Sequence, residues 1–478
     1  MSFTSHLFLF YFLPLVLVAT YAVPRRQVTA RNAVLLAANC LFYGWLDIRF
    51  MGLLLLSAIF NYFVSCAMSR KANKTDRFWW LVLALGINLG CLGFFKYALF
   101  FEKSLNSTMG AFGGAGLPLI EVVLPVGISF FTFKAVSHAV DTYRTGRAPG
   151  SLLNFLCYLS FFPQVLSGPI QRYGSTDATA ESLPSFAEQL TQRTLTLDRI
   201  AQGIALFMLG FAKKILLADV IASSADVVFS ASDPAAIDAW FGTLAYTFQL
   251  YFDFSAYSDM AIGLGLMLGI ACGRNFNAPY RAVSITDFWR RWHISLSSWF
   301  RDYLYIPLGG NRRGVSRSYL NLVVVFLLCG LWHGAAWTFV FWGLYHGLLL
   351  ILERVLGRKT CYAGLPRSIQ IVMTFILISI GWVFFRSTTL ADALHRLTIM
   401  FTGAAAQGGA SLLTGQLWTR GSIVMMMLCA ILVFQPRQGC DWIKDLTWIK
   451  LLVLVILFVL ALAILFARSF TSFLYFQF

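Results

Sequence analysis

Runs of about 20 apolar residues recur along the whole chain and constrain its fold more than any other feature. A helix of that length crosses a hydrocarbon core of about 30 Å. Only 12% of the residues are charged, against roughly a quarter in soluble globular proteins. The short apolar–polar alternation of membrane β-barrels is absent from the sequence. The sequence therefore predicts an all-α integral membrane protein with about 10–12 transmembrane helices.

Two apolar stretches are long enough for more than one crossing. We expect a helical hairpin in each of them, 238–272 and 318–357. The segment 151–171 contains Pro163 and is predicted to be re-entrant, because irregular backbone at membrane depth is tolerated only where protein or a water-filled cavity covers it. The other candidate spans are 6–23, 32–46, 50–68, 78–100, 119–140, 200–220, 367–386, 421–436 and 448–467.

The net charge of +16 is distributed as in membrane proteins rather than in nucleic-acid binders. Lys and Arg gather in short segments between apolar runs, at 25–31, 70–77 and 290–317, which is typical of cytoplasmic loops beside membrane lipid. On this pattern the N-terminus and the tail 469–478 lie outside the cytoplasm, and no nucleic-acid partner is expected. The nine cysteines lack metal-ligand spacing, so no metal is expected either.

Two polar islands interrupt this apolar background, the block 288–310 and the triplet Trp332-His333-Gly334. Ionisable groups at membrane depth are costly and suggest function. Burial of His333 favours neutral imidazole, the form that a general base needs, and its flanking glycines leave space for a narrow substrate path. The alternative is a core histidine bonded to a backbone carbonyl.

His293 is predicted to lie on an amphipathic helix and to share a face with Trp289 and Phe300. A functional and a structural role are equally compatible with its sequence context. Arginines occupy the other faces, where guanidinium groups bind phosphates or anchor to anionic lipid headgroups. These arginines are Arg290, Arg291 and Arg301.

Other polar residues in apolar stretches have simpler interpretations. Asp253 and Asp259 lie among Ser and Tyr residues, which favours a structural hairpin turn over proton handling. The remaining histidines have no partner that the sequence reveals, and we treat His138, His346 and His395 as structural. A serine nucleophile elbow, a Ser/His/Asp constellation and a nucleotide-binding Walker loop are absent from the sequence.

The motifs around both histidines resemble the membrane-bound O-acyltransferase family, in particular its bacterial branch of alginate O-acetylation and teichoic-acid D-alanylation proteins. The two main matches are FWRRWHISLSSWFRDYLYIPLGGNRRG (288–314) and LWHGAAWTFVFWGLYHG (331–347). Others are LFYGW (41–45), LPVGISFFTF (124–133), FFPQVLSGPI (161–170), AYTFQLYFDFSAYSDMAIGLGLMLG (245–269), GWVFFR (381–386) and FLYFQF (473–478). The similarity runs from end to end, with the alginate-type proteins as the nearest match.

This resemblance implies a single transmembrane domain over 1–478, with a central tunnel and a catalytic block at about 240–350. His333 is then the catalytic histidine and His293 a second functional one. The implied enzyme, a multi-pass protein of the bacterial inner membrane, has no resident cofactor. It moves acetyl groups from a cytoplasmic thioester, acetyl-CoA, to a periplasmic SGNH-type acetyltransferase partner that modifies an alginate-type polysaccharide.

Further residues take roles within that hypothesis. Arg290, Arg291, Arg312 and Arg313 are candidates to hold the phosphates of the donor, with Trp289 and Arg301 as further substrate-binding residues. The indole N–H of Trp332 is a candidate to stabilise the oxyanion. Tyr475 is either a transient acyl acceptor or an aromatic anchor at the membrane surface.

The resemblance leaves other functions open. Within the same fold, the polysaccharide is alternatively peptidoglycan or cellulose, or the group transferred is D-alanine to teichoic acid. A polytopic transporter belongs to a different class, although the absence of a visible inverted repeat argues against it.

Overall fold

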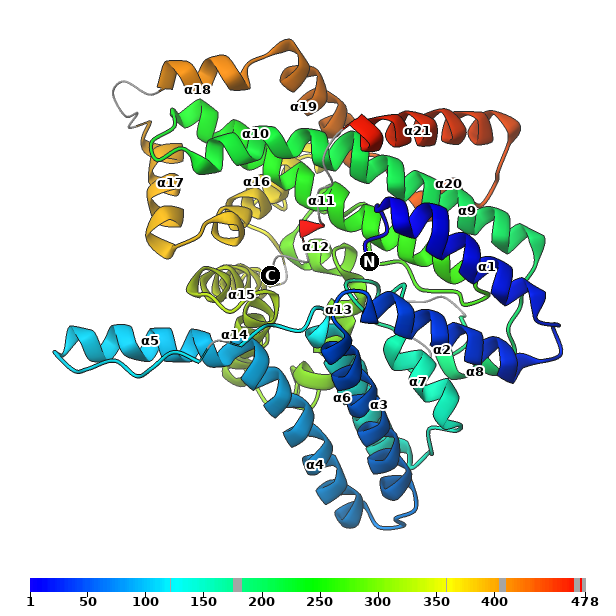
Figure 1. Cartoon of the computed structure of the whole chain (residues 1–478). Coiled ribbons are helices and arrows are strands. Elements are labelled where there is room, and N and C mark those ends of the chain that lie inside the picture. The colour runs from blue at the N-terminus through cyan, green and yellow to red at the C-terminus, as the bar shows by residue number, and fades with distance from the viewer. Residues whose placement is uncertain (121, 175–182, 358, 404–409, 468–472, 475–478) are drawn as a thin grey trace. The chain divides into compact units, whose positions relative to one another are not determined.

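The computed structural model describes residues 1–120, 122–174, 183–357, 359–403, 410–467 and 473–474, and within these ranges the chain is helical and contains no strand (Figure 1). The prediction of an all-α protein is confirmed. The chain forms two compact units. The first comprises 1–204 and 261–273, and the second 205–260 and 274–478. That the chain acts as one domain stays a prediction.

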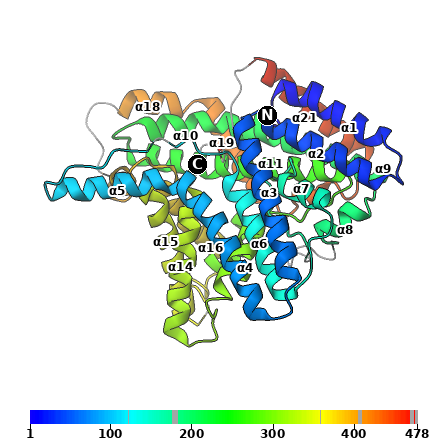
Figure 2. The same cartoon turned by 60° about the horizontal axis from the view of Figure 1, so that its bottom comes forward.

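The first unit is built from helices that follow one another along the N-terminal part of the chain. They are η1 (Phe8–Phe12), α1 (Leu13–Ala22), α2 (Val28–Gly44), α3 (Ile48–Ser69), α4 (Lys74–Leu92), η2 (Gly93–Tyr97), α5 (Ala98–Ala111), α6 (Ile128–Thr145), α7 (Leu152–Ser160), α8 (Phe186–Thr191) and the start of α9 (Leu197–Ala212). Helices α3, α4 and α6 pack together, as Figure 2 shows.

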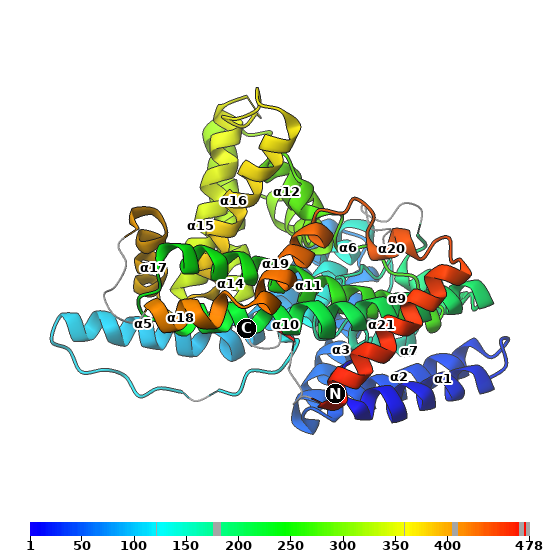
Figure 3. The ribbon, with the colours of Figure 1, turned by 90° about the horizontal axis from the view of Figure 1, so that it is seen from above.

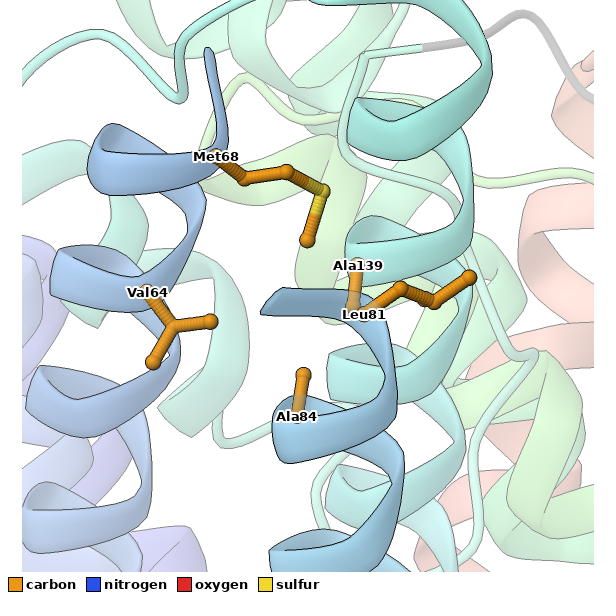
Figure 4. Close-up of a cluster of buried hydrophobic side chains, with 5 residues drawn as sticks. All are labelled: Val64, Met68, Leu81, Ala84 and Ala139. Atoms are coloured by element: carbon orange, nitrogen blue, oxygen red, sulfur yellow. The ribbon is translucent and has the colours of Figure 1, made fainter. Parts of the chain in front are cut away.

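Small and medium apolar side chains fill the contact between these three helices. Figure 4 shows Val64 and Met68 of α3, Leu81 and Ala84 of α4, and Ala139 of α6 in one buried cluster. Farther along, the amides of Asn61 and Asn88 donate to each other's carbonyl oxygens at 3.1 and 2.8 Å. Such reciprocal bonds satisfy polar side chains that lipid would leave unpaired.

The second unit holds both polar islands of the sequence. Its helices are η3 (Lys213–Ala218), α10 (Asp219–Ser230), most of α11 (Ala236–Met267), η4 (Pro279–Arg281), α12 (Ile285–Arg291), α13 (Ile294–Phe300), η5 (Arg301–Tyr305), α14 (Val315–His333), α15 (Trp337–Val355), α16 (Arg367–Arg386), α17 (Leu390–Thr402), α18 (Ala410–Leu417), α19 (Arg420–Val433), α20 (Gly439–Trp442) and α21 (Trp448–Ala467). Figure 3 shows α14, α15 and α16 side by side.

By length and composition, six helical segments within the described ranges are apolar enough to cross a membrane, fewer than the ten to twelve expected. They are 48–69, 74–111, 315–333, 337–355, 367–386 and 448–467. Two shorter apolar helices cover 8–22 and 420–433. The expected hairpin at 318–357 is confirmed as α14 and α15.

The hairpin expected at 238–272 is wrong, because α11 runs unbroken through that stretch. The aspartates that suggested a turn instead lie within α11 and pair with lysines of η3. Asp253 lies 2.8 Å from the Nζ of Lys214, and Asp259 lies 2.6 Å from that of Lys213. Paired in this way, a buried carboxylate does not need the solvent of a turn.

Candidate active site

Residues 285–305 form a helical hairpin whose two ends lie together. At its start, the carboxylate of Glu353 accepts hydrogen bonds from the backbone N–H groups of Ile285 and Thr286, at 2.6 and 3.0 Å. At its end, the Tyr305 hydroxyl lies 3.3 Å from the Oγ of Ser318. Ser318 lies in the first turn of α14 and Glu353 in the last turn of α15. Both limbs therefore start from the same end of the α14–α15 pair.

The tip of this hairpin is His293, and it reaches the opposite end of α14. Its ring centroid lies 5.9 Å from that of Trp332 and 6.5 Å from that of His333, the last residue of α14. His293 adopts the left-handed conformation (φ 43°, ψ 55°), in which α12 has ended and α13 begins. The single amphipathic helix predicted through His293 is therefore wrong, because the chain must reverse there. Irregular backbone of this kind is tolerated at membrane depth when protein covers it.

The side chain of Asn275 fixes the orientation of the His293 ring. Its Oδ1 lies 3.2 Å from Nδ1 of His293 and also accepts hydrogen bonds from the backbone N–H and the hydroxyl of Ser295. Because these donors identify that atom as the oxygen, Nδ1 of His293 must carry the proton. The lone pair therefore resides on Nε2. The ring is fully buried, where a charged imidazole would be costly to hold.

His333 lies among aromatic rings at the end of α14. Its ring centroid is 4.9 Å from that of Trp332, 5.0 Å from Trp342 on α15, and 5.3 Å from Phe385 on α16. The side chain is 4% exposed. Three helices and the His293 tip therefore enclose one imidazole in apolar surroundings, where a proton transfer is shielded from bulk water.

The sequence predicted that the glycines beside His333 leave space for a substrate path, but in the structure neighbouring atoms occupy that space. A Cβ added to Gly330 would lie 2.1 Å from the backbone oxygen of Phe339, and one added to Gly334 would lie 2.0 Å from the Phe339 ring. A Cβ added to Gly343 on α15 would likewise lie 2.2 Å from the backbone oxygen of Phe326. These glycines serve the close approach of α14 and α15, which is the usual use of small residues between membrane helices.

The predicted substrate-binding arginines are not brought together at His333. Arg291 pairs with Asp287 at 2.7 Å and Arg301 with Asp302 at 2.6 Å, whereas Arg290 is exposed. Arg312 and Arg313 are exposed just before α14. With 19 residues, α14 is about 28 Å long, and His333 is at its other end.

The predicted site tryptophans take different places. Trp332 lies beside both histidines. Trp289 lies on the α12 limb, with its ring 5.8 Å from Trp342 and 5.2 Å from His346. Tyr475 lies outside the described residues.

Sequence reasoning missed two residues that shape the site. Asn275 and Glu353 are ordinary polar residues whose role depends on partners in other elements. His346, which was treated as structural, is buried one helical turn from Trp342, and its structural role stays a prediction. His395, which also had no visible partner, is paired with Asp233 at 2.9 Å.

The described residues contain no group of three or more His, Cys, Asp or Glu side chains that could hold a metal ion. The expectation that the site needs no metal stays a prediction.

A family model described as MBOAT, membrane-bound O-acyltransferase family, matches residues 120–389, which include both histidines and every element around them. The chain belongs to the membrane-bound O-acyltransferase family. It is therefore a multi-pass membrane protein and an O-acyltransferase, as the resemblance implied. The match covers the α14–α15 pair and the hairpin 285–305 in full.

Named relatives agree with this assignment. The chain is 45% identical over 405 residues to a probable alginate O-acetylase of Azotobacter vinelandii, covering 84% of this chain and 78% of the relative. It is 40% identical to one of Pseudomonas putida over the full length of both. A peptidoglycan O-acetyltransferase of Helicobacter pylori is 37% identical, covering 83% and 79%. A teichoic acid D-alanyltransferase of Bacillus subtilis is more distant, at 31% over 54% of this chain and 68% of its own.

Proposed function

We propose that this protein transfers acetyl groups from a cytoplasmic thioester, acetyl-CoA, across the bacterial inner membrane for O-acetylation of an alginate-type polysaccharide. One observation carries the chemistry: the tip His293 and the helix-end His333 lie with ring centroids 6.5 Å apart in an enclosed aromatic site. The identity of the relatives supports the acetyl group and the polysaccharide class.

In the proposed reaction, Nε2 or Nδ1 of His333 accepts the proton of an attacking hydroxyl. The hydroxyl oxygen forms a bond to the thioester carbonyl, the C–S bond breaks, and the thiolate leaves and is protonated as free CoA. A neutral imidazole can accept that proton, and general-base catalysis of this kind contributes about 10²–10⁴-fold. Asn275 holds His293 in the tautomer whose Nε2 can accept a proton, which suits a second proton-handling role. The indole N–H of Trp332, beside both rings, is the proposed donor to the oxyanion.

The basic end of the α14–α15 pair is the proposed entry of the donor. Arg312, Arg313 and Arg354 lie at that end, and Arg290 lies along the α12 limb. Guanidinium groups bind phosphates well, and the length of α14, about 28 Å, suits phosphates at one end and a thioester at the other. The acceptor is a hydroxyl at the outer face, on an SGNH-type partner or relayed by Tyr475.

The same site with a different acceptor or acyl group is the alternative. The relatives include peptidoglycan O-acetyltransferase and teichoic acid D-alanyltransferase. The higher identity to the alginate O-acetylases favours acetyl and alginate. A passive transporter would not release CoA.

The decisive experiment measures CoA release from labelled acetyl-CoA by the purified protein in lipid, with its periplasmic partner. His333→Ala is expected to lower the rate by about 10²-fold or more, in the range of a lost general base. His293→Ala is expected to lower it by a smaller factor. His395→Ala is the matched control, because His395 is exposed and hydrogen-bonded to Asp233 outside the aromatic site. Undiminished release from His333→Ala would refute the mechanism.

A further inference from the structure

Phe473 and Leu474, close to the C-terminus, are buried against α11, at 0% and 9% exposed. The backbone N–H of Leu474 donates to Oδ2 of Asp253 at 3.0 Å. The ring of Phe473 lies edge-on to that of Tyr257, with centroids 5.2 Å apart and an interplanar angle of 88°. One stretch of α11 therefore holds the segment 473–474, although Asp253 and Leu474 are 221 residues apart in the chain.

Asp253 belongs to a buried cluster of charges. Nζ of Lys214 lies 2.8 Å from Oδ1 of Asp253 and 2.6 Å from Oδ1 of Asp219. It also lies 4.8 Å from the ring centroid of Phe473. Lys214 and Asp253 are each 2% exposed, and a buried carboxylate is stabilised by several donors, of which a backbone N–H is one. The cluster thus binds the segment twice, through the Leu474 amide and through the Phe473 ring.

The same stretch of α11 supports His293 on a neighbouring face. The ring centroid of Phe254 lies 4.7 Å from that of His293. The hydroxyl of Ser258 accepts a hydrogen bond at 3.3 Å from Asn275, the side chain that orients the His293 ring. Phe254 and Ser258 are four residues apart and share a helical face, and each directly follows a residue that binds the segment 473–474. Consecutive residues of α11 therefore hold the C-terminal segment and the support of His293.

Stability alone is a weak explanation for this cluster. A buried ion pair contributes little net stability, because the cost of desolvation offsets the attraction. The pair of Lys213 and Asp259, at 2.6 Å, already joins η3 to α11. Lys214 lies in the π-helical turn η3, and such turns frequently occur at functional sites. What distinguishes the cluster around Lys214 is its contact with the C-terminal segment.

We infer that Asp253 is a positioning residue of the acyl transfer, which docks the C-terminal segment 473–474 against α11 beside His293. Lys214 orients the carboxylate, so that one oxygen faces the lysine and the other faces the segment. The docked segment fixes the part of α11 on which the His293 ring rests, and the transfer requires it. The inference rests on the proposed function, because the acyl transfer is the step that is positioned.

The first measurement asks whether Asp253 holds the segment and does not depend on activity. The full chain in lipid nanodiscs is digested with carboxypeptidase, and mass spectrometry follows the loss of Leu474. Asp253→Leu is expected to lose Leu474 about tenfold faster than the wild type or more, the effect of one lost hydrogen bond to a charged group. The fold is expected to persist, because Lys214 keeps its bond to Asp219.

Two further variants serve as controls for this digestion. Asp253→Asn keeps an acceptor oxygen at the same place and is expected to retain most of the protection. Lys213→Met combined with Asp259→Leu removes the neighbouring ion pair as a unit, which leaves neither partner as an unpaired buried charge. This double variant is expected to lose Leu474 at the rate of the wild type.

The second measurement asks whether docking positions the reaction. In Asp253→Leu the kcat of CoA release is expected to fall about tenfold with the KM for acetyl-CoA unchanged, and Asp253→Asn is expected to recover most of it. Leu474→Pro removes the N–H donor and is expected to match Asp253→Leu, whereas Leu474→Ala keeps the donor and the rate. Combining Asp253→Leu with Leu474→Pro is expected to slow the reaction no further than either change alone.

Contrary results overturn the inference in distinguishable ways. Equal loss of Leu474 from the wild type and from Asp253→Leu would show that Asp253 does not hold the segment. Faster loss with an unchanged kcat would reduce the docking to a structural contact. Multiplying effects in the combined variant would show that the two residues act separately. If digestion differs as expected but no chain releases CoA, the proposed acetyltransfer fails and the docking stands.

Discussion

At the scale of single residues, the site depends on how neutral imidazoles are held. His293 is buried with Asn275 on its Nδ1. Asn275 in turn accepts a hydrogen bond from the Ser295 hydroxyl, and its amide donates one to the Ser258 hydroxyl at 3.3 Å. The side chain of Asn275 therefore decides which nitrogen of His293 carries the proton. His293 also occupies a left-handed conformation that few side chains adopt.

We expect Asn275→Ala to lower the rate of CoA release about tenfold, because His293 loses the acceptor that fixes its tautomer, at a cost of roughly 1.4 kcal/mol. Asn275→Asp keeps an acceptor at the same place and is expected to retain more activity. Steady-state rates with acetyl-CoA measure the difference. Equal rates in both variants would mean that the tautomer of His293 is immaterial.

At the scale of elements, the α14–α15 pair is the scaffold that brings His333 and the hairpin 285–305 together. Its glycines allow the two backbones to approach closely. At its basic end, Glu353 accepts a hydrogen bond from Ile285 at the start of the hairpin, and Arg354 lies over the ring of Tyr305 at the end of the hairpin. The distance from the base of the hairpin to its tip is thereby matched to the length of α14. A shift of α14 along α15 would move His333 away from His293.

Alanine substitutions at glycines along this contact should differ by position. A Cβ at Gly343 would lie 2.2 Å from a backbone oxygen, whereas one at Gly347 meets nothing nearer than 3.4 Å, one turn along the same helix. We expect Gly343→Ala to lose about 1–3 kcal/mol of stability through overpacking, and to lose activity as α14 is displaced. Gly347→Ala is expected to be close to the wild type in both. Thermal melting and CoA release measure the two effects. A Gly343→Ala variant with wild-type stability and activity would disprove the close packing of α14 and α15.

At the scale of the whole molecule, the charges of the second unit indicate an orientation in the membrane. Arg312, Arg313 and Arg317 precede α14, Arg354 ends α15, and Arg367 begins α16, so this end of the three helices is basic. Basic segments stay in the cytoplasm. In the orientation that we propose, His333 lies toward the outer end of α14, on the side of the proposed acceptor.

Cysteine labelling tests this orientation directly. Cys361, between α15 and α16, is exposed, and the other eight cysteines are buried or partly buried. A membrane-impermeant maleimide is expected to label Cys361 in inverted membrane vesicles and not in intact spheroplasts, with Cys361→Ser as the control for specificity. Labelling of intact spheroplasts would reverse the orientation and place the basic end outside.

The sequence by itself determined the class of fold, the two histidines and the family, because apolar runs of membrane length and long motifs are local features. The helical hairpin at 318–357 could be predicted for the same reason. The break at His293, the continuous helix α11 and the partners of Asn275 and Glu353 could not, since each depends on a contact with a residue distant in the chain. The stretch around Asp253 and Asp259 was predicted to be a turn, but these aspartates lie in the helix α11 and pair with Lys214 and Lys213. Only the tertiary structure decided which side chains surround His333, because Trp342 and Phe385 reach it from two other helices.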